Sequence, residues 1–337
     1  MNKFENFKVN IKSMFLEEIY MNISPASSYR NRCEFGYSNN CYTMYALEKK
    51  VYMKHFDIAC KAIKDAMPIL LNEINNSEEV KEKLFQINFR SNNQNELMVT
   101  MIYHKIIKSN LIKKIEEIAS RLNIKIIIRS KNFKHASNDF FIKDKLTINN
   151  LKLFQSDNSF YQPNKYLLIR MIKKIIDFID NPDDLIELYC GVGTFTIPLS
   201  FVFNNILATE NNRVSIKCLE LGVKENKIKN IHFSRLSSDE VCKLYMGNHF
   251  NRMKGKSLSM FNFSHVLVDP PREGLSDNVL NLIKKFKNII YVSCNPKTYL
   301  RDIKLLSSHR IKNIELFDQF PNTEHLEIVS LLSKEIN

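Results

Sequence analysis

The sequence lacks any hydrophobic run long enough to cross a membrane. None of its 337 residues lies in a stretch approaching the roughly 18 consecutive apolar residues that a membrane-spanning helix needs. The first 21 residues carry six charged side chains, so they do not contain the apolar region of a secretory signal. We therefore expect a cytoplasmic protein that does not bind membranes.

The chain also lacks a metal-binding cysteine pattern. It has seven cysteines, an odd number, and no pair of them has the C-x-x-C spacing. This argues against zinc and iron–sulfur sites and against a disulfide framework, so we expect reduced thiols and no metal. Most isolated cysteines are small apolar fillers of a core. We assign that role to Cys33, Cys41, Cys60, Cys218 and Cys242.

Acidic residues are scarce relative to basic ones. The 49 lysines and arginines exceed the 36 aspartates and glutamates, which gives a net charge of +13. Such an excess favours a polyanionic partner, and nucleic acid is the usual one. Lys, Asn and Ile are abundant throughout the chain, so a genome rich in A and T is the alternative explanation.

No internal repeat or low-complexity linker is present, and the first half of the chain has a mixed α+β pattern. Residues 29–36 and 42–47 flank an Asn39–Asn40 turn, and the alternating runs 85–89 and 97–101 flank a polar loop. Each pair predicts a β-hairpin. A helix from about residue 109 and a strand at 125–129 follow.

The second half alternates strands with helices, beginning with a helix that we expect to start at Pro163. The apolar runs that predict strands are residues 184–189, 205–209, 264–268 and 288–293. This alternation predicts an α/β fold with a parallel sheet covered on both faces. Two last runs, 314–320 and 328–332, predict a closing hairpin. We place the domain boundary after residue 155.

A glycine loop follows the strand at 184–189. Gly191 and Gly193 allow close approach of the backbone to a ligand, although a tight turn against a neighbour would explain them equally well. Glu210 ends the next strand about 20 residues later, where a carboxylate can bind ribose hydroxyls. The third glycine of a pyrophosphate-binding loop is missing. The pocket therefore fits adenosine without a diphosphate, and S-adenosylmethionine is the obvious ligand.

An acidic-proline loop, Asp269 to Arg272, ends the third of these strands and directs a carboxylate to the same crevice. Proline that simply terminates a strand is the structural alternative. Adenine and cytosine amino-methyltransferases have a similar loop, but an aromatic residue follows the prolines there. Arg272 occupies that position here, which disfavours such an activity.

Cys294 is the candidate nucleophile. It lies between a predicted strand and a helix for which Asn295 is a suitable N-cap and Pro296 a suitable first residue. We expect the helix N-terminus to lower the pKa of this thiol and make the thiolate available. Cys190, beside the glycines, is interpreted as pocket lining.

Covalent catalysis by a thiolate suits a substrate such as uracil, whose C5 is a poor nucleophile. Addition of the thiolate at C6 produces an enolate that carries electron density at C5. After methyl transfer, a base must remove the C5 proton so that the thiolate can leave. Glu327 lies where the last strand is expected to begin and is the preferred base, with Glu324 and His325 as rivals.

Nine segments together resemble the TrmA-type tRNA (uracil-5-)-methyltransferases, within the wider family of RNA 5-methyluridine enzymes. The resemblance covers nearly the whole chain. The segments are YRNRCEF (29–35), KLFQI (83–87), YHK (103–105), NSFYQPN (158–164), LYCG (188–191), VDPPR (268–272), SCNP (293–296), FDQFP (317–321) and HLE (325–327).

The resemblance implies that residues 1–155 form an N-terminal α+β RNA-binding domain and residues 156–337 a Rossmann-like methyltransferase catalytic domain. It implies that Cys294 is the nucleophile and Glu327 the proton acceptor. It further implies a set of contacts to S-adenosylmethionine. These residues are Gln162, Tyr189, Thr194, Glu210 and Asp269, of which Thr194 replaces an asparagine that we associate with the family.

The expected substrate is the T-loop uridine at position 54 of tRNA, with the equivalent loop of tmRNA as a further target, and we expect the enzyme to be a monomer. RNA loops are bound through base stacking and cations. The candidate RNA-binding residues are Arg30, Arg32, Phe85, His104 and Arg272. The target base must leave its stack to reach Cys294.

Three other functions remain open. Methylation of rRNA is one, although the iron–sulfur cysteines and the small β-barrel domain of some rRNA-modifying relatives are missing. A non-catalytic module that folds tRNA is another. A cytosine C5 enzyme is disfavoured, because that chemistry usually places a second cysteine in the acidic-proline loop.

Overall fold

In the computed structural model the described residues, 2–46 and 48–334, group into two compact units. Apart from residues 1, 47 and 335–337, which are not described, unit 1 comprises Met1–Ser24, Leu146–Leu153 and Ser159–Asn337. Unit 2 comprises Pro25–Lys145 and Phe154–Asn158. The units are interleaved along the chain, because residues 2–24 and 146–153 group with the later unit. A single boundary after residue 155 does not represent this interleaving.

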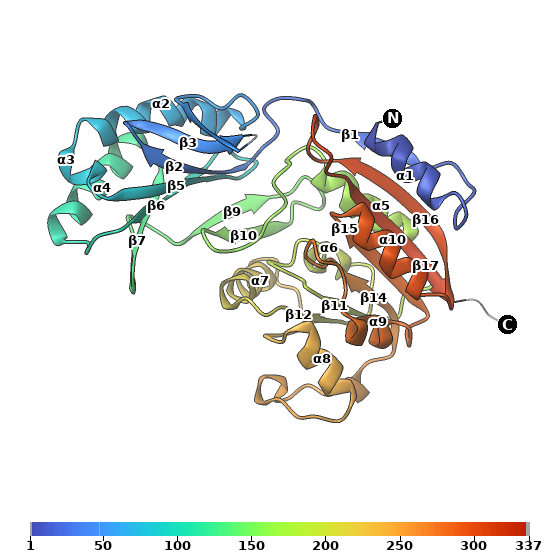
Figure 1. The fold of residues 1–337 in the computed structure, drawn as a ribbon. Coiled ribbons are helices and arrows are strands. Elements are labelled where there is room, and N and C mark those ends of the chain that lie inside the picture. The colour runs from blue at the N-terminus through green and yellow to red at the C-terminus, as the bar shows by residue number, and fades with distance from the viewer. Residues whose placement is uncertain (1, 47, 335–337) are drawn as a thin grey trace. The chain divides into compact units, whose positions relative to one another are not determined.

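Unit 1 contains a sheet of eight strands in the described residues, in the order β1-β16-β17-β15-β14-β11-β12-β13 (Figure 1). Strands β11 to β15 run parallel to one another, whereas β17 is antiparallel to both β15 and β16. The predicted parallel sheet and closing hairpin are thus confirmed, and the fold is α/β. The strands are β1 (Tyr20–Ile23), β11 (Asp184–Leu188), β12 (Ile206–Thr209), β13 (Ile231–Ser234), β14 (Phe263–Val268), β15 (Asn288–Ser293), β16 (His309–Asp318) and β17 (Glu327–Lys334).

A helix follows each of the strands β11 to β15, and α1 and α5 complete the helices described for this unit. The helices are α1 (Lys3–Ile11), α5 (Leu168–Phe178), α6 (Thr196–Leu199), α7 (Arg213–Glu225), α8 (Ser238–Tyr245), α9 (Asp277–Ile283) and α10 (Pro296–Leu305), with short 3₁₀ turns η1 (Asn251–Met253) and η2 (Leu258–Met260).

The start that we predicted for α5, Pro163, is wrong: the helix begins at Leu168. The Asn164 side chain accepts a hydrogen bond from the Tyr166 backbone N–H and donates one to the Gln319 carbonyl. Such bonds between a side chain and nearby backbone compete with helix formation and hold the segment in a turn.

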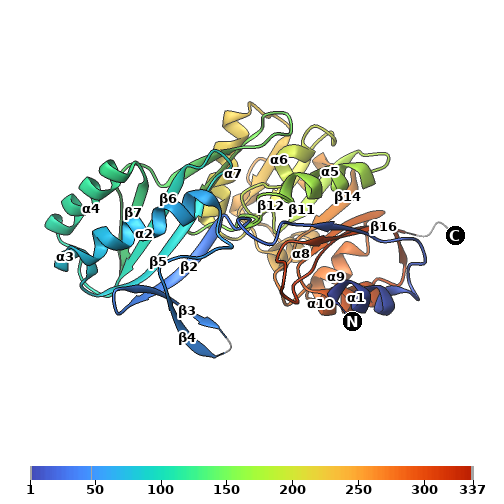
Figure 2. The same ribbon diagram turned by 90° about the horizontal axis from the view of Figure 1, so that it is seen from above.

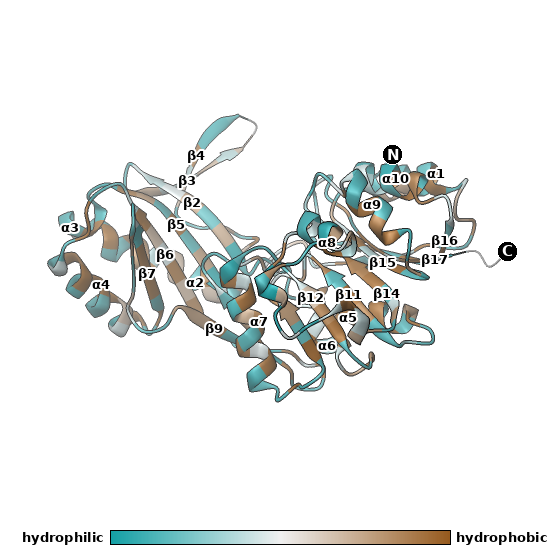
Figure 3. Ribbon diagram, turned by 90° about the horizontal axis from the view of Figure 1, so that it is seen from below, coloured by the Kyte–Doolittle hydropathy of each residue, from teal (hydrophilic) through white to brown (hydrophobic). Residues whose placement is uncertain are grey.

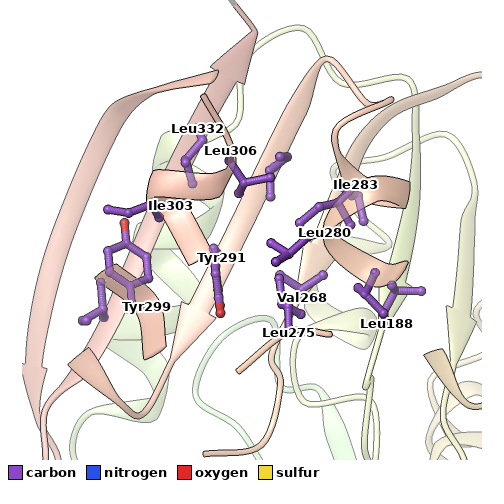
Figure 4. Packing of buried hydrophobic residues seen from close by; sticks show 14 of the residues in the cluster. Leu188, Val268, Leu275, Leu280, Ile283, Tyr291, Tyr299, Ile303, Leu306 and Leu332 are labelled. Carbon is purple, nitrogen blue, oxygen red and sulfur yellow. The ribbon is translucent and has the colours of Figure 1, made fainter. Parts of the chain in front are cut away.

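A hydrophobic core joins the central strands of unit 1 to α9 and α10. Figure 4 shows Leu280 and Ile283 of α9 close to Val268 of β14, and Tyr291 of β15 beside Tyr299 of α10. Figure 3 shows hydrophobic residues along β11 and β14, as expected for strands that are buried on both faces. Burial of this apolar surface fixes the strand ends from which the loops of the site emerge.

Unit 2 contains a seven-stranded sheet in the order β4-β3-β2-β5-β6-β7-β8, shown from above in Figure 2. It is antiparallel except for β6 and β7, which are parallel and joined through a helix. A separate two-stranded sheet pairs β9 with β10, of which Lys152 and Leu153 are grouped with unit 1. The strands are β2 (Arg32–Ser38), β3 (Cys41–Ala46), β4 (Lys49–Met53), β5 (Leu84–Ser91), β6 (Leu97–Tyr103), β7 (Lys125–Ser130), β8 (Phe133–Ala136), β9 (Phe141–Lys145) and β10 (Lys152–Ser156).

Both predicted hairpins of this unit are confirmed. Asn39 and Asn40 have φ angles of 52° and 57°, the left-handed values that a two-residue hairpin turn needs and that asparagine tolerates. Leu47, the last residue of the predicted 42–47 run, lies outside the described residues. β4, which follows, was not predicted.

Three helices of unit 2 are α2 (Lys61–Asn75), α3 (Glu78–Lys81) and α4 (Ser109–Leu122). The side chains of Ile63, Met67 and Leu70 on α2 and Ile115 on α4 are buried in one core with β5 and β6. No helix within residues 2–46 and 48–334 is both long and apolar enough to cross a bilayer.

The cysteine predictions are mostly confirmed. Cys33, Cys60, Cys218 and Cys242 are buried. Cys41 is half-buried, so its assignment as a buried filler is wrong. It is the first residue of β3, directly after the exposed turn, where the sheet gives less cover.

Candidate active site

The site lies where the strand order of unit 1 reverses. β11 pairs with β12 on one side and with β14 on the other, and successive connections lead away from this point in both directions. Ligands of open α/β sheets bind in the crevice at the carboxyl ends of such strands. The glycine loop follows β11 and Asp269 follows β14, so both predicted loops meet at this crevice.

The glycine loop has an unusual backbone. Tyr189, Gly191 and Gly193 have φ angles of 61°, 55° and 86°. A Cβ on Gly193 would lie 2.4 Å from a Leu219 methyl carbon, so only glycine fits there. A Cβ on Gly191 would meet no atom within 4 Å, so the backbone at this residue borders open space. The loop therefore leaves room for a ligand at the end of β11.

The Glu210 carboxylate supports this loop from the end of β12. One of its oxygens accepts a hydrogen bond from the Gly191 N–H at 3.1 Å and the other from the Asn212 N–H at 2.6 Å. Each carboxylate oxygen retains a further lone pair for a hydroxyl donor. Thr194, the next predicted contact, lies buried in the turn that precedes α6.

Two carboxyl groups with raised pKa values, those of Asp269 and Glu187, lie at the crevice. Burial raises the pKa of Asp269 to about 7. Burial, with a further contribution from the Asp269 carboxylate, raises the pKa of Glu187 to about 8. In the described part of the chain, Glu187 Oε2 has no hydrogen-bond partner. Such groups at a cleft are typical of functional sites.

Glu187 was missed in the sequence. The signal that could have found it is a lone glutamate inside the apolar strand β11, every residue of which is buried. A carboxyl group with one unpartnered oxygen is costly to bury in such a strand, which makes Glu187 a candidate functional group.

A buried amide pair lines the same end of the sheet. Gln319 Nε2 donates to Gln162 Oε1 at 2.9 Å, and Gln319 Oε1 has no partner in the described residues. Gln162 was predicted as a ligand contact, whereas Gln319 was noted only within the resembling FDQFP segment. A free acceptor beside a predicted contact adds Gln319 to the site.

Cys294 lies at the end of β15, half-buried, and the predicted helix start after it is confirmed. Asn295 is the N-cap of α10, its side chain accepts a hydrogen bond from the Lys297 N–H, and Pro296 is the first helical residue. The predicted pKa direction is wrong. Burial and the carboxylates of Glu327 and Asp269 raise the pKa of the Cys294 thiol to about 12, although Arg272 opposes them.

Glu327 is the neighbour of Cys294 across two antiparallel strands. Ser293 of β15 pairs with Ile328 of β17, so Cys294 and Glu327 occupy facing positions one step beyond that pair. Glu327 is buried, and burial together with the Asp269 carboxylate raises its pKa to about 8. Of its rivals, Glu324 is exposed and His325 is half-buried.

A cavity of about 510 Å³ opens beside Cys294. Arg272 lines it and is exposed, with one guanidinium nitrogen 3.4 Å from His325 Nε2. Asn295, Lys297 and Glu324 also line it. The candidate site of unit 1 thus contains the Cys294 thiol, the buried Glu327 carboxyl group and the Arg272 guanidinium group, next to a crevice with further carboxyl groups.

Comparison with known proteins decides the family. The family model described as tRNA (Uracil-5-)-methyltransferase matches residues 1–335 of the chain. The chain belongs to the tRNA (uracil-5-)-methyltransferase family. The family and reaction class predicted from the sequence segments are therefore confirmed.

Individual relatives agree with this membership. A protein of Campylobacter lari named tRNA/tmRNA (uracil-C(5))-methyltransferase is 44% identical, over 95% of this chain and 94% of its own length. One of Saccharophagus degradans with the same name is 37% identical, over 94% and 91%. The crystal structure of Pyrococcus abyssi tRNA (uracil-54, C5)-methyltransferase in complex with S-adenosyl-L-homocysteine has the same fold, with a TM-score of 0.77 at 22% identity, covering 98% of this chain and 82% of that one.

Among the RNA-binding candidates of this methyltransferase, Phe85 and His104 of unit 2 are brought together. Their rings stack with centroids 4.3 Å apart and planes 17° from parallel, and Phe85 is 49% exposed. The pairing of β5 with β6 shifts register between Leu84 and Gln86. Such an irregularity re-aims a side chain, which explains why Phe85 points outward while Ile87 is buried.

The remaining candidates are more ordinary. Arg30 donates from Nε to the Arg32 carbonyl, and Arg32 forms an ion pair with Glu34 at 2.5 Å. Both arginines are half-buried. Arg272 belongs to unit 1, at the rim of the cavity.

Proposed function

We propose that this protein methylates C5 of the T-loop uridine at position 54 of tRNA, and of the equivalent loop of tmRNA, through a covalent bond between Cys294 and C6. The observation that carries the proposal is the facing arrangement of Cys294 and Glu327 at one end of β15 and β17, beside the crevice at Asp269. The names of the relatives support the choice of tRNA and tmRNA as substrates.

S-adenosylmethionine suits the crevice at the end of β11. Its ammonium and sulfonium groups are cationic, and a bound cation would return the Glu187 and Asp269 carboxyl groups to the charged form that burial now disfavours. The open space at Gly191 would admit the ligand, and Glu210 would accept from ribose hydroxyls. Tyr189, Thr194 and Gln162 complete the predicted contacts. When bound, S-adenosylmethionine supplies an electrophilic methyl group.

The first chemical step is addition of the Cys294 sulfur to C6 of uracil. The S–H proton passes to water in the cavity, the thiolate forms a C6–S bond, and the electron pair of the C5–C6 double bond moves into the ring to give an enolate. Arg272 lowers the pKa of this thiol, against the burial and the carboxylates that raise it, and so favours the reactive thiolate. The methyl donor, when bound, would supply the methyl group that C5 of the enolate accepts.

The last step is β-elimination. A carboxylate removes the C5 proton, the C5–C6 double bond forms again and the C6–S bond breaks to release the thiolate. Glu327 fits this role, because a base with a pKa near 8 is strong enough to accept a carbon-bound proton and still partly ionised near neutral pH. Its burial keeps water from competing for the proton.

RNA capture is assigned to aromatic and basic residues. The Phe85–His104 stack presents a flat face to which an unstacked base can add, and the half-buried Arg30 and Arg32 would supply cations for phosphates. Arg272 would contact the flipped nucleotide at the cavity. The protein acts as a cytoplasmic monomer in this proposal.

The decisive experiment uses a T-arm RNA in which 5-fluorouridine replaces the target uridine, together with S-adenosylmethionine. Fluorine at C5 cannot be removed as a proton, so the methylated adduct should persist as a covalent complex on a denaturing gel. The complex should require both the methyl donor and Cys294. A wild-type protein that forms no such complex with the T-arm would contradict the proposal.

Two controls separate the alternatives. Mapping of 5-methyluridine in RNA from cells with and without the protein should locate the methyl group in tRNA, whereas loss from rRNA would favour the rRNA alternative. If the Cys294→Ala variant restores every cellular effect of the protein, a non-catalytic tRNA-folding module is the better description.

A further inference from the structure

Helix α1 lies at the reaction site, although nothing in the sequence analysis assigned it a role. The cavity beside Cys294 is lined on one side by Lys3, Asn6 and Asn10 of this helix. Figures 1 and 2 show α1 alongside α10, the helix that follows Cys294, and the rings of Phe7 and Tyr299 meet with centroids 6.0 Å apart. An N-terminal segment thus forms part of the wall that the substrate meets.

α1 is firmly attached to unit 1. Its apolar side chains Phe4, Phe7 and Ile11 are buried in the core. Asn2 caps the helix, since its side chain accepts hydrogen bonds from the Phe4 and Glu5 N–H groups. A residue on this helix can therefore hold a neighbouring loop in place.

Lys3 binds one such loop with all three of its ammonium protons. Its Nζ lies 2.6 Å from Asp318 Oδ1, 3.2 Å from the Phe320 carbonyl oxygen and 2.9 Å from the Thr323 carbonyl oxygen. The side chains of Lys3 and Asp318 are only 10% and 8% exposed. An ammonium group has three donors, and here each has an acceptor on the same short segment.

That segment joins β16 to β17 and carries much of the site. It begins after Asp318, the last residue of β16, and ends at Glu327, the first residue of β17. Glu324 and His325 on it line the cavity. Lys3 therefore fixes the start and the middle of the loop that delivers the proposed base.

We propose that Lys3 is a positioning residue for the removal of the C5 proton by Glu327. The inference rests on the proposed function. Lys3 holds the loop so that the Glu327 carboxylate stays aligned with C5, whereas the addition of Cys294 to C6 depends on β15 and α10, which Lys3 does not hold. A small misplacement of a catalytic group costs orders of magnitude in rate, so elimination should be selectively slowed.

The test is the Lys3→Met variant with T-arm RNA and S-adenosylmethionine. With 5-fluorouridine RNA the covalent complex should form within about twofold of the wild-type rate. With unmodified RNA, turnover should fall by about tenfold or more, and a methylated covalent complex should accumulate. The Lys3→Arg variant, which retains charge and donors, should recover part of the turnover.

Two further variants control for folding and for charge. Loss of Lys3 leaves Asp318 buried without its partner, which destabilises proteins. The double variant Lys3→Met/Asp318→Asn removes both charges and should show the same accumulation. Lys8→Met removes a lysine on the same helix that makes no hydrogen bond to residues 318–325 in the described chain, and should behave as wild type.

The outcomes distinguish this inference from the proposed function. A proportional fall in complex formation and turnover would mean a general structural role and overturn it, as would wild-type elimination in Lys3→Met. Hydrogen–deuterium exchange provides a readout without RNA: amides 320–326 should exchange faster in Lys3→Met than in Lys8→Met. Equal exchange in the two variants would overturn the proposed role of Lys3 in holding this loop, even if the wild type methylates tRNA. A wild type that does not methylate tRNA defeats the proposed function instead.

Discussion

Two cysteines occupy equivalent places in the sheet of unit 1 and have different surroundings. Cys190 follows β11 and Cys294 follows β15, so each lies at the carboxyl end of a parallel strand. Burial raises the pKa of both thiols. Cys190 is 4% exposed and precedes a glycine loop, whereas Cys294 is half-buried at a cavity and precedes the N-cap of a helix.

The two thiols therefore differ in access and in neighbouring groups, whereas the pKa of each is raised. Cys294 faces the proposed base at the start of β17, and Arg272 lowers the pKa of its thiol. Among the groups that act on Cys190 are the carboxyl groups of Glu187 and Glu210, which raise its pKa further. A thiol whose pKa is raised in the free protein can still react if the bound substrate changes its surroundings and the substrate can reach it.

Substitution of the two cysteines should give the largest contrast. Cys294→Ala should reduce methylation by about 10⁴-fold or more and abolish the covalent complex, because the route through the C6 adduct is lost. Cys190→Ala should stay within about fivefold, since it removes only a pocket-lining side chain. Steady-state methylation of T-arm RNA measures both. Equal losses in the two variants would remove the distinction.

Glu327→Gln should produce the next largest effect and show that the two sides of the Cys294 site act at different steps. We expect turnover to fall by about 10²- to 10⁴-fold, because a general base is lost, while the methylated adduct still forms. Quantification of protein-linked methylated RNA checks this. Glu324→Gln, at an exposed position on the same loop, is the matched control and should turn over normally.

Phe85→Ala should test whether capture of RNA is separate from both cysteine loops. Loss of one stacking surface should raise KM for T-arm RNA by about tenfold and leave kcat within about twofold. Ile69→Ala removes an exposed apolar side chain on α2 that lines a different cavity from Phe85, and should change neither constant by more than about twofold. A fall in kcat without a change in KM would place Phe85 outside RNA capture.

The pH dependence of turnover should report Glu327 rather than Cys190. Elimination requires the carboxylate form, so turnover should rise with pH through an apparent pKa of about 8. The decay rate of the isolated methylated adduct against pH is the direct measurement. If the rise of this rate with pH persists in Cys190→Ala and disappears in Glu327→Gln, the titrating group is Glu327.

Stability should change with pH by the smallest amount and in the opposite sense to activity. The folded-state pKa values of Glu187, Glu327 and Asp269 lie above their unfolded values, so the folded state binds more protons between about pH 4 and pH 8. The free energy of unfolding therefore falls as pH rises through that range, by about 1 kcal/mol or more. Chemical denaturation at several pH values measures this. Glu187→Gln should reduce the slope.

The sequence predicted the parts of the site that depend on neighbours along the chain. The N-cap Asn295, the helix start at Pro296 and the placement of Glu327 at the beginning of a strand are local features, and all three are confirmed. The predicted direction of the Cys294 pKa shift was wrong because burial in the folded chain raises this pKa most, and carboxyl groups from two other parts of the sheet raise it further.

Other features required three-dimensional information of the same kind. Glu187 attracts notice only when β11 is known to be buried on both faces. Phe85 points outward because of a register shift that alternation of apolar residues does not reveal. Lys3 lies more than 300 positions from its partner Asp318 along the chain, and no periodic pattern links them.

The reversed direction of β17 has a consequence for synthesis of the protein. β17 lies between β15 and β16 and runs antiparallel to both. Its first residue, Glu327, is therefore at the same edge of the sheet as the last residues of the parallel strands. The proposed nucleophile Cys294 is therefore synthesised before the proposed base Glu327, and the two face each other only after residues 327–334 have been made and have paired with β15. A chain that ends before residue 327 would retain Cys294 but lack both the proposed base and the strand that lies between β15 and β16.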